Sequence, residues 1–457
     1  MGQKTGVATK KFTKPTTEGN PLIANVFCAD PTAVEYEGRL YVYGTNDHQQ
    51  YEAVGAEGRN TYERIKSIVM LSTDDMSNWT FHGLINVGEI SPWAMASWAP
   101  SITSRVEADG LTHFYLYYSN SGWGTGVLTA TSPIGPWSSP IGKSVVDGDT
   151  EGLDGCKNPF DPGVVTDDDG ASWLSFGGGE GGGRLIKLSS DMSAVDGAIV
   201  KLPSPYHFEA NELNFINGTY VYTYNNNWEE RTNWNVSGHE PPTRCSMSYM
   251  TTKTPLDASS WEYRSQYFEN PGDMGLGDSN NHTHLHKFAG KYYLFYHTLF
   301  PQAELGTQGG FRSLSVDEIE VDEQAVKIFP TKATKTGPKQ IKPLDGFKTT
   351  SAATMFTSSG IVYDLGDMIT VNAADKSGVV MIKRVSAEGA SKLFVKADGK
   401  GTLELYLDRL DTAFAQVNID GRNTEIECEL PEKITGEHDI YFVLSEGVQF
   451  EKWSFLK

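Results

Sequence analysis

The sequence predicts an all-β protein with two domains, a five-bladed β-propeller followed by a β-sandwich of the jelly-roll type. At 457 residues the chain is too long for one ordinary hydrophobic core, which favours two domains. Glycine (47 residues) and tyrosine (21 residues) are plentiful, and long apolar helical periodicities are hard to find. A strand pattern also recurs five times before residue 300, as a propeller requires.

A tyrosine-rich segment is the most regular part of each repeat. Each segment alternates or runs apolar in the manner of a β-strand, and a turn signal such as Asn217-Gly218 precedes most of them. The five segments are residues 40–43, 114–118, 173–176, 220–224 and 292–296.

A short polar or acidic motif lies upstream of each tyrosine-rich segment. The five motifs are Ala29-Asp30-Pro31, Ser97-Trp98-Ala99-Pro100, Phe160-Asp161-Pro162, Phe208-Glu209-Ala210 and Asn281-His282-Thr283-His284. They recur roughly every 50 to 75 residues, the scale of one four-stranded blade with insertions. The innermost strand of each blade faces the central channel. The repeat therefore predicts that Asp30, Trp98, Asp161, Glu209 and His282 meet near the channel axis.

The sequence changes character after about residue 335. Residues 335–348 (KTGPKQIKPLDGFK) carry the lysine, glycine and proline that are typical of a linker. Short alternating strands follow, for example residues 403–407 and 439–444, with glycine and aspartate turns between them. This pattern predicts a propeller over residues 18–335 and a β-sandwich over residues 346–457.

The composition argues against several classes of partner. A formal net charge of -20 repels phosphate backbones, which argues against nucleic acid as a partner. No apolar run approaches the roughly 20 residues that span a bilayer, so no membrane partner is expected. No apolar stretch follows the basic N-terminus, so a cytoplasmic location is expected, or a secreted one if a leader has been removed. The four cysteines lie far apart, with no metal-ligand spacing.

In order and phase, the motifs resemble glycoside hydrolase family 43. The resemblance covers roughly residues 18–335 and rests on these segments: Asn20-Pro21, Ala29-Asp30-Pro31-Thr32, Trp98-Ala99-Pro100-Ser101, Phe160-Asp161-Pro162, Phe208-Glu209-Ala210 and Asn281-His282-Thr283-His284. It implies a five-bladed propeller whose active site opens at one end of the channel, and a hydrolase that inverts the anomeric centre.

The resemblance also implies roles for three acids. Asp30 is expected to be the general base, Glu209 the general acid, and Asp161 the residue that orients the acid and adjusts its pKa. Inverting hydrolysis needs a base and an acid about 6.5 to 9.5 Å apart, and a third carboxylate nearby keeps the acid protonated. Glu212 is the nearest competitor for the general acid, but the spacing to the Asn-Gly turn favours Glu209.

Further residues are candidates for contacts with the sugar. Arg312 matches an arginine that contacts the sugar in related enzymes. Trp98 and Trp93 are candidate walls of the sugar site, although either side chain could instead be part of the core. Asp47 and His48 could bind sugar hydroxyls, or lie in a surface loop.

The resemblance implies that His282 helps to hold a calcium ion, or a similar hard cation, at the channel axis, mostly through water. The alternation of His282, His284 and His286 puts all three on one strand face, which suggests zinc as an alternative. Zinc requires three or four nitrogen or sulfur ligands at short range, whereas an oxygen-rich acidic pocket suits calcium better. Calcium is therefore the expected metal.

The C-terminal region resembles a family 6 carbohydrate-binding module in residues 403–408, 436–441 and 450–453. Such modules usually bind sugar with exposed aromatic side chains, and these strands offer few. Trp453 is expected to pack in the core. The domain is therefore expected to brace the propeller, with lost or weak sugar binding.

The expected function is an exo-acting α-L-arabinofuranosidase that releases arabinose from pentose-containing oligosaccharides or polysaccharides derived from arabinoxylan or arabinan. A β-D-xylosidase with the same three acids, or an enzyme with both activities, is the nearest alternative. A non-catalytic sugar-binding propeller is the alternative outside enzymes, and it would be expected to lack one of the three acids.

Overall fold

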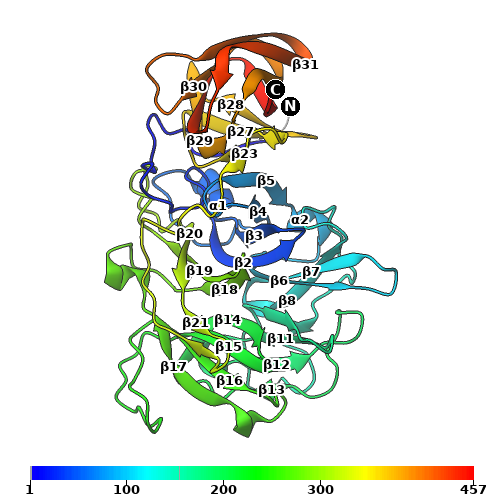
Figure 1. Ribbon diagram of the computed structural model, residues 1–457. Coiled ribbons are helices and arrows are strands. Elements are labelled where there is room, and N and C mark those ends of the chain that lie inside the picture. The colour runs from blue at the N-terminus through cyan, green and yellow to red at the C-terminus, as the bar shows by residue number, and fades with distance from the viewer. Residues whose placement is uncertain (1–2, 154) are drawn as a thin grey trace.

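A computed structural model describes residues 3–153 and 155–457 of the chain. Five blade sheets surround a channel, and a curled β-domain lies at one side of this propeller, at the top of Figure 1. The predicted all-β fold is confirmed. Only short helices interrupt the strands, among them α1 (Asp47–Val54) and α2 (Val87–Ile90). No helix among the described residues is long and apolar enough to cross a membrane.

Each blade is an antiparallel sheet whose strands follow one another along the chain. The first blade contains β2 (Ala29–Tyr36), β3 (Arg39–Thr45), β4 (Ile68–Thr73) and β5 (Trp79–Ile85). The second contains β6 (Trp98–Val106), β7 (Thr112–Ser119), β8 (Gly124–Ala130) and β9 (Val146–Asp147). The third contains β10 (Gly163–Thr166), β11 (Ser172–Phe176), β12 (Arg184–Lys187) and β13 (Val200–Lys201). The fourth contains β14 (His207–Ile216), β15 (Thr219–Asn226), β16 (Met247–Thr252) and β17 (Glu262–Phe268), and the fifth contains β18 (Thr283–Phe288), β19 (Lys291–Thr298) and β20 (Ser313–Ile319).

The first strands of the five blades form a closed ring around the channel. β2 contacts β6, β6 contacts β10, β10 contacts β14, β14 contacts β18, and β18 contacts β2. The tyrosine-rich segments are the second strands β3, β7, β11, β15 and β19, and their side chains fill the cores between neighbouring blades. The sequence repeat therefore corresponds to the blades.

The ring closes between the fifth blade and the N-terminal segment. The backbone N–H of Leu22 donates to the carbonyl oxygen of Leu314 at 2.9 Å. The Asn20 side chain donates to the Val316 carbonyl at 3.0 Å and accepts from the Val316 N–H at 2.9 Å. These bonds satisfy backbone N–H and C=O groups on the free edge of β20, so they join the start of the propeller to its end.

The C-terminal domain is one sheet of eleven strands that curls over itself. Its central strand β30 (Ala390–Leu407) pairs with β33 (Val448–Leu456) over its first half and with β32 (Glu437–Ser445) over its second half. Gly399 lies where the pairing changes, with φ of 92°, and an added Cβ would meet the Gly447 carbonyl oxygen at 2.0 Å. One bent strand therefore serves both faces of the sandwich.

The remaining strands complete this sheet. They are β23 (Leu344–Asp345), β24 (Thr350–Ser351), β26 (Thr357–Ser359), β27 (Ile361–Leu365), β28 (Ile369–Ala373), β29 (Ser377–Ser386) and β31 (Ala415–Ile434). Trp453 is completely buried, as expected.

Strand exchange joins the two domains. β1 (Gln3–Thr5) pairs with β27 of the C-terminal sheet, and β25 (Thr354–Met355) pairs with β5 of the first blade. The rings of Phe81 and Tyr363 pack across the junction with centroids 4.5 Å apart. The domain junction is therefore a continuous core. The N-terminal segment, dark blue in Figure 1, reaches the C-terminal domain, where β1 adds a strand to the sheet.

Candidate active site

A backbone irregularity recurs at the start of the inner strands. Asp30, Ala99, Asp161 and Ala210 all have positive φ, between 41° and 57°. In blades one, two and four the pairing of the first two strands shifts register at this point. Such a bulge re-aims a side chain out of the sheet. The motif residue of each of these blades is thereby directed to the end of the channel.

The re-aimed side chains line a small cavity of about 120 Å³. Its lining residues are Asp30, Tyr62, Trp98, Phe160, Asp161, Glu209, Asn280 and Arg312. The structure therefore brings the three predicted acids together with Trp98 and Arg312, from segments up to 282 residues apart.

Asp30 lies in a cationic environment. Its carboxylate accepts hydrogen bonds from Arg312 Nη1 at 2.9 Å and from the Thr45 hydroxyl at 2.7 Å. Burial would raise the pKa of Asp30, but the Arg312 guanidinium and the nearby histidines outweigh burial and hold it well below its usual range. Asp30 is therefore ionised near neutral pH.

Two histidines adjoin Asp30. Nε2 of His297 donates to the Asn280 carbonyl at 2.8 Å, so its Nδ1 is the acceptor for the Asp30 backbone N–H at 3.2 Å. Burial lowers the pKa of His282, whose Nδ1 lies 3.6 Å from an Asp30 oxygen, to about 4. Arg312 is thus the permanent positive charge at Asp30.

Glu209 and Asp161 lie on the opposite side of the cavity. Burial raises the pKa of Glu209 to about 7, although a hydrogen bond from Asn280 Nδ2 at 3.1 Å opposes the shift. Burial, followed by the charges of Glu209 and Asp30, raises the pKa of Asp161 well above its usual range. Asp161 accepts the Ala210 N–H at 2.9 Å and the Ser119 hydroxyl at 3.3 Å, and both bonds oppose this shift. The pKa values of both carboxyl groups are raised, so the pair retains a proton near neutral pH.

Glu212, the competitor for the general acid, lies elsewhere. It is 2% exposed, and its carboxylate is 3.3 Å from His284 Nδ1. It is not one of the residues that line the cavity in the described part of the chain. This position agrees with the preference for Glu209.

Asp47, His48 and Trp93 do not occupy the expected positions. Asp47 is completely buried and binds the guanidinium of Arg312, so it has no access to sugar hydroxyls. His48 is 2% exposed in α1, where it accepts the Gly6 N–H at 3.1 Å. The alternative prediction, that Asp47 and His48 lie in a surface loop, is also wrong, because both are buried in this helix. Trp93 packs against Tyr118 in the core between blades one and two. All three residues are close in sequence to a strand end. This closeness could not show whether a side chain lines the cavity or lies in the layer beneath it.

Asn280, Tyr62 and Phe160 line the cavity but were not singled out from the sequence. Asn280 bonds both Glu209 and Arg312, the latter at 3.3 Å, and so connects the two sides. Tyr62 stacks under Arg312, with the guanidinium carbon 4.9 Å from the ring centroid. Phe160 is the first residue of the motif Phe160-Asp161-Pro162, and Asn280 directly precedes the motif that begins at Asn281, so their positions were the available signal. Tyr62 lies in a long loop with no periodic pattern.

No three histidine, cysteine, aspartate or glutamate residues are placed to hold a metal ion in residues 3–153 and 155–457. His282 is buried beside Asp30 and could offer one nitrogen ligand. Such a donor set fits a hard cation bound largely through water and does not fit a zinc site.

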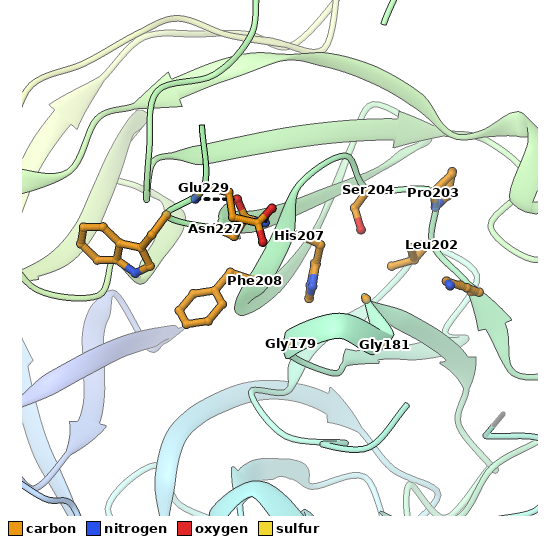
Figure 2. A pocket seen from close by; sticks show the side chains of 12 residues that line it. Gly179, Gly181, Leu202, Pro203, Ser204, His207, Phe208, Asn227 and Glu229 are labelled. Carbon is orange, nitrogen blue, oxygen red and sulfur yellow. Dashed lines mark hydrogen bonds between the residues drawn. The ribbon is translucent and has the colours of Figure 1, made fainter. Parts of the chain in front are cut away.

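A second, larger cavity of about 690 Å³ is lined in part by β14, the strand that also carries Glu209. Phe208 lines the larger cavity and the next residue, Glu209, lines the smaller one. Figure 2 shows Phe208 and His207 projecting into it from β14, the loop with Gly179 and Gly181 below them, and Pro203 and Ser204 to one side. Trp228, 39% exposed, also lines it. The larger cavity therefore combines aromatic rings with polar groups.

Comparison with known proteins agrees with the fold and the site described above. Residues 18–324 match the profile of Glycosyl hydrolases family 43. An arabinoxylan arabinofuranohydrolase from Bacillus subtilis (strain 168) is 33% identical over 489 aligned positions, which cover 95% of this chain and 92% of that protein.

Solved structures show the same architecture. The crystal structure of a family 43 arabinoxylan arabinofuranohydrolase from Bacillus subtilis, in complex with cellotetraose, matches with a TM-score of 0.89 and 30% identity over 99% of both chains. A β-xylosidase/α-arabinofuranosidase from a compost microbial metagenome, solved with xylotriose in a calcium-free form, matches with a TM-score of 0.51. It is 21% identical and covers 72% of this chain and 99% of its own, so it supports the fold alone.

Proposed function

The chain belongs to glycosyl hydrolases family 43 and is a glycoside hydrolase, and we propose that it acts as an exo-acting, inverting α-L-arabinofuranosidase. Its proposed substrates are arabinoxylan or oligosaccharides derived from arabinoxylan or arabinan. The similarity to arabinoxylan arabinofuranohydrolases over nearly the whole chain supports this substrate class.

The observation that carries the mechanism is the difference between the carboxyl groups of one cavity. Asp30 is paired with Arg312 and ionised, so it accepts a proton from the attacking water. Glu209 has a pKa of about 7 and carries a proton that it donates to the leaving glycosidic oxygen. Direct attack by the water inverts the anomeric centre, because no enzyme group bonds to the sugar.

Asp161 supports the acid through the backbone. Its Oδ2 accepts the N–H of Ala210, the residue after Glu209, so it fixes the chain at the acid. An ionised Asp161 would also disfavour ionisation of Glu209. In the proposed mechanism the pair holds its proton on Glu209, which lines the cavity.

The size of the two cavities supports exo action on a branched substrate. A cavity of about 120 Å³ is far smaller than a site for an oligosaccharide, so it suits one terminal sugar ring. The leaving group must lie on the side of the acid, where the cavity of about 690 Å³ is lined by Phe208 and Trp228. Aromatic rings bind the apolar faces of sugar rings, so this cavity suits the polysaccharide from which arabinose is removed.

A calcium ion at the channel axis is the proposed cofactor. His282 would supply one ligand and water the others. The bound ion would contribute positive charge near Asp30. The compost-metagenome relative was solved in a calcium-free form, which supports calcium as a ligand of this fold.

The test compares two aryl glycosides, 4-nitrophenyl α-L-arabinofuranoside and 4-nitrophenyl β-D-xylopyranoside, with the anomer of the released sugar followed by NMR. Faster cleavage of the arabinofuranoside, with an inverted first product, is expected. Faster cleavage of the xyloside would instead identify a β-xylosidase, an activity ascribed to the compost-metagenome relative beside that of an α-arabinofuranosidase. Binding of arabinoxylan oligosaccharides without cleavage of any substrate would indicate a sugar-binding propeller.

A further inference from the structure

We propose that Asp47 is a positioning residue of the active site, which holds the guanidinium of Arg312 in the one orientation that lets Nη1 reach the general base. The inference rests on the proposed function in one respect, the role of Asp30 as the base. Asp47 itself is outside the cavity and acts through Arg312.

The contacts of Arg312 are divided between two carboxylates. Nε donates to Asp47 Oδ2 and Nη2 to Asp47 Oδ1, both at 2.9 Å, and the Arg312 backbone N–H donates to Asp47 Oδ2 at 3.0 Å. The remaining nitrogen, Nη1, donates to Asp30 Oδ1 at 2.9 Å. Because a guanidinium is planar and rigid, a bidentate partner on two nitrogens fixes the direction of the third.

Asp47 is itself held firmly. It is the first residue of α1, directly after Asn46, whose side chain accepts the Gln49 N–H at 3.3 Å. Asn60 Nδ2 donates to Asp47 Oδ2 at 2.7 Å, and Asp47 is 0% exposed. The helix start and this amide leave Asp47 no other position, so the orientation of Arg312 is determined from outside the cavity.

The face of the guanidinium is also fixed. Tyr62 stacks on Arg312, which is 3% exposed, with the guanidinium carbon 4.9 Å above the ring centroid. A buried arginine with two free nitrogens would be costly, and would turn to find other acceptors in the cavity. Removal of Asp47 is therefore expected to displace Nη1 from Asp30 and from Asn280.

A double-mutant cycle tests this dependence. Asp47→Asn is expected to lower kcat about 100-fold, the cost of a small misplacement of a catalytic group. Arg312→Lys keeps the charge but loses the planar fork, and is also expected to lose about 100-fold. The double variant should lose no more than Arg312→Lys alone, within about threefold, because Asp47 acts only through the fork. Multiplied losses, about 10⁴-fold, would overturn the proposal.

Asp75→Asn is the matched control. Asp75 is also a 0% exposed aspartate, held by the N–H groups of Ser77 and Asn78 at 2.8 Å in the turn between β4 and β5. Its substitution should lower the melting temperature and leave kcat within about twofold of the wild type. A loss of kcat as large as that of Asp47→Asn would show that any buried aspartate has this effect, and the proposal would fail.

Chemical rescue provides a second measurement that does not require Asp47→Asn to fold by itself. Guanidinium ion at millimolar concentration should restore kcat of Arg312→Ala at least tenfold, since Asp47 still offers two oxygens to it. The double variant Asp47→Asn/Arg312→Ala should show no rescue. Equal rescue in both variants would refute the positioning role.

The outcomes separate the two levels of inference. If Asp30→Asn keeps wild-type kcat, the proposed base is wrong and the proposed function fails. If Asp30→Asn is inactive and the cycle is additive, only the role of Asp47 is refuted. All assays use the full chain and whichever aryl glycoside the wild type cleaves faster.

Discussion

On the side of the cavity where blades one and five meet, Asp30 shares its carboxylate with Arg312, two histidines and the Thr45 hydroxyl. On the side built by blades three and four, Glu209 and Asp161 are in no ion pair among the described residues, and each meets neutral donors only. Both sides are formed by the same kind of blade motif. The difference lies in the partners around each carboxyl group, and it is the basis for the proposed roles of Asp30 as base and Glu209 as acid.

The largest expected effect follows from deleting either acid. Asp30→Asn and Glu209→Gln should each lower kcat about 10³-fold or more on xylan-derived oligosaccharides. A 2,4-dinitrophenyl arabinoside has a leaving group that needs no proton, so Glu209→Gln should recover most of its loss on it, whereas Asp30→Asn should not. Kinetics on both substrates measure this, and recovery by Asp30→Asn would reverse the assignment.

The second effect concerns recognition of the leaving group. Trp228→Ala should raise KM for arabinoxylan about tenfold, since stacking on one aromatic ring is lost, and should leave KM for an aryl arabinofuranoside unchanged. Leu111→Ala, at an exposed position in the turn between β6 and β7, is the control. An equal change on both substrates would place Trp228 outside the leaving-group site.

The third effect concerns the pH profile. Because Glu209 must be protonated and its pKa is about 7, kcat/KM should fall above about pH 7. Asn280 donates to Glu209 and stabilises its ionised form, so Asn280→Leu should move this alkaline limb to higher pH by up to about one unit. The pH dependence of kcat/KM measures the shift. A limb that stays in place would mean that another group titrates.

The last effect is on stability. The raised pKa of Glu209 favours folding fully below its unfolded pKa of about 4.5, and this contribution is lost as pH rises through about 7. Glu209→Gln removes the ionisable group, so relative to wild type it should gain roughly 2.5 kcal/mol between pH 5 and pH 8. Melting temperatures at both pH values measure the gain, with the exposed Glu230→Gln as control. No difference between the two pH values would contradict the raised pKa.

The site residues that could be predicted from the sequence are those that belong to the repeated blade motif. Asp30, Trp98, Asp161 and Glu209 occupy equivalent places in successive blades, so the repeat alone predicted that they converge, and the cavity confirms it. His282 also lies at the channel, beside Asp30. Asp47 and His48 follow a recognised strand but lie in a helix below the cavity, and their prediction as sugar ligands was wrong.

The contacts between the two domains also could not be predicted from local sequence patterns. The sequence predicted separate domains on either side of a linker near residue 335, whereas in the structure β1 from the N-terminus pairs with β27, and β25 pairs back to β5. Pairing between distant short strands leaves no periodic signal, because each contributes only two or three residues to a sheet.

The sequence by itself determined the fold class, the number of blades and the convergence of Asp30, Asp161 and Glu209 on one cavity, because each is encoded in a local pattern that recurs in phase. Only the tertiary structure decided how Arg312 is shared between Asp30 and Asp47, how Asn280 connects both sides, and that Glu209 lacks a cationic partner within the described chain. These relations depend on distances between residues up to 282 positions apart. Protonation depends on such distances and on burial, which no local pattern specifies.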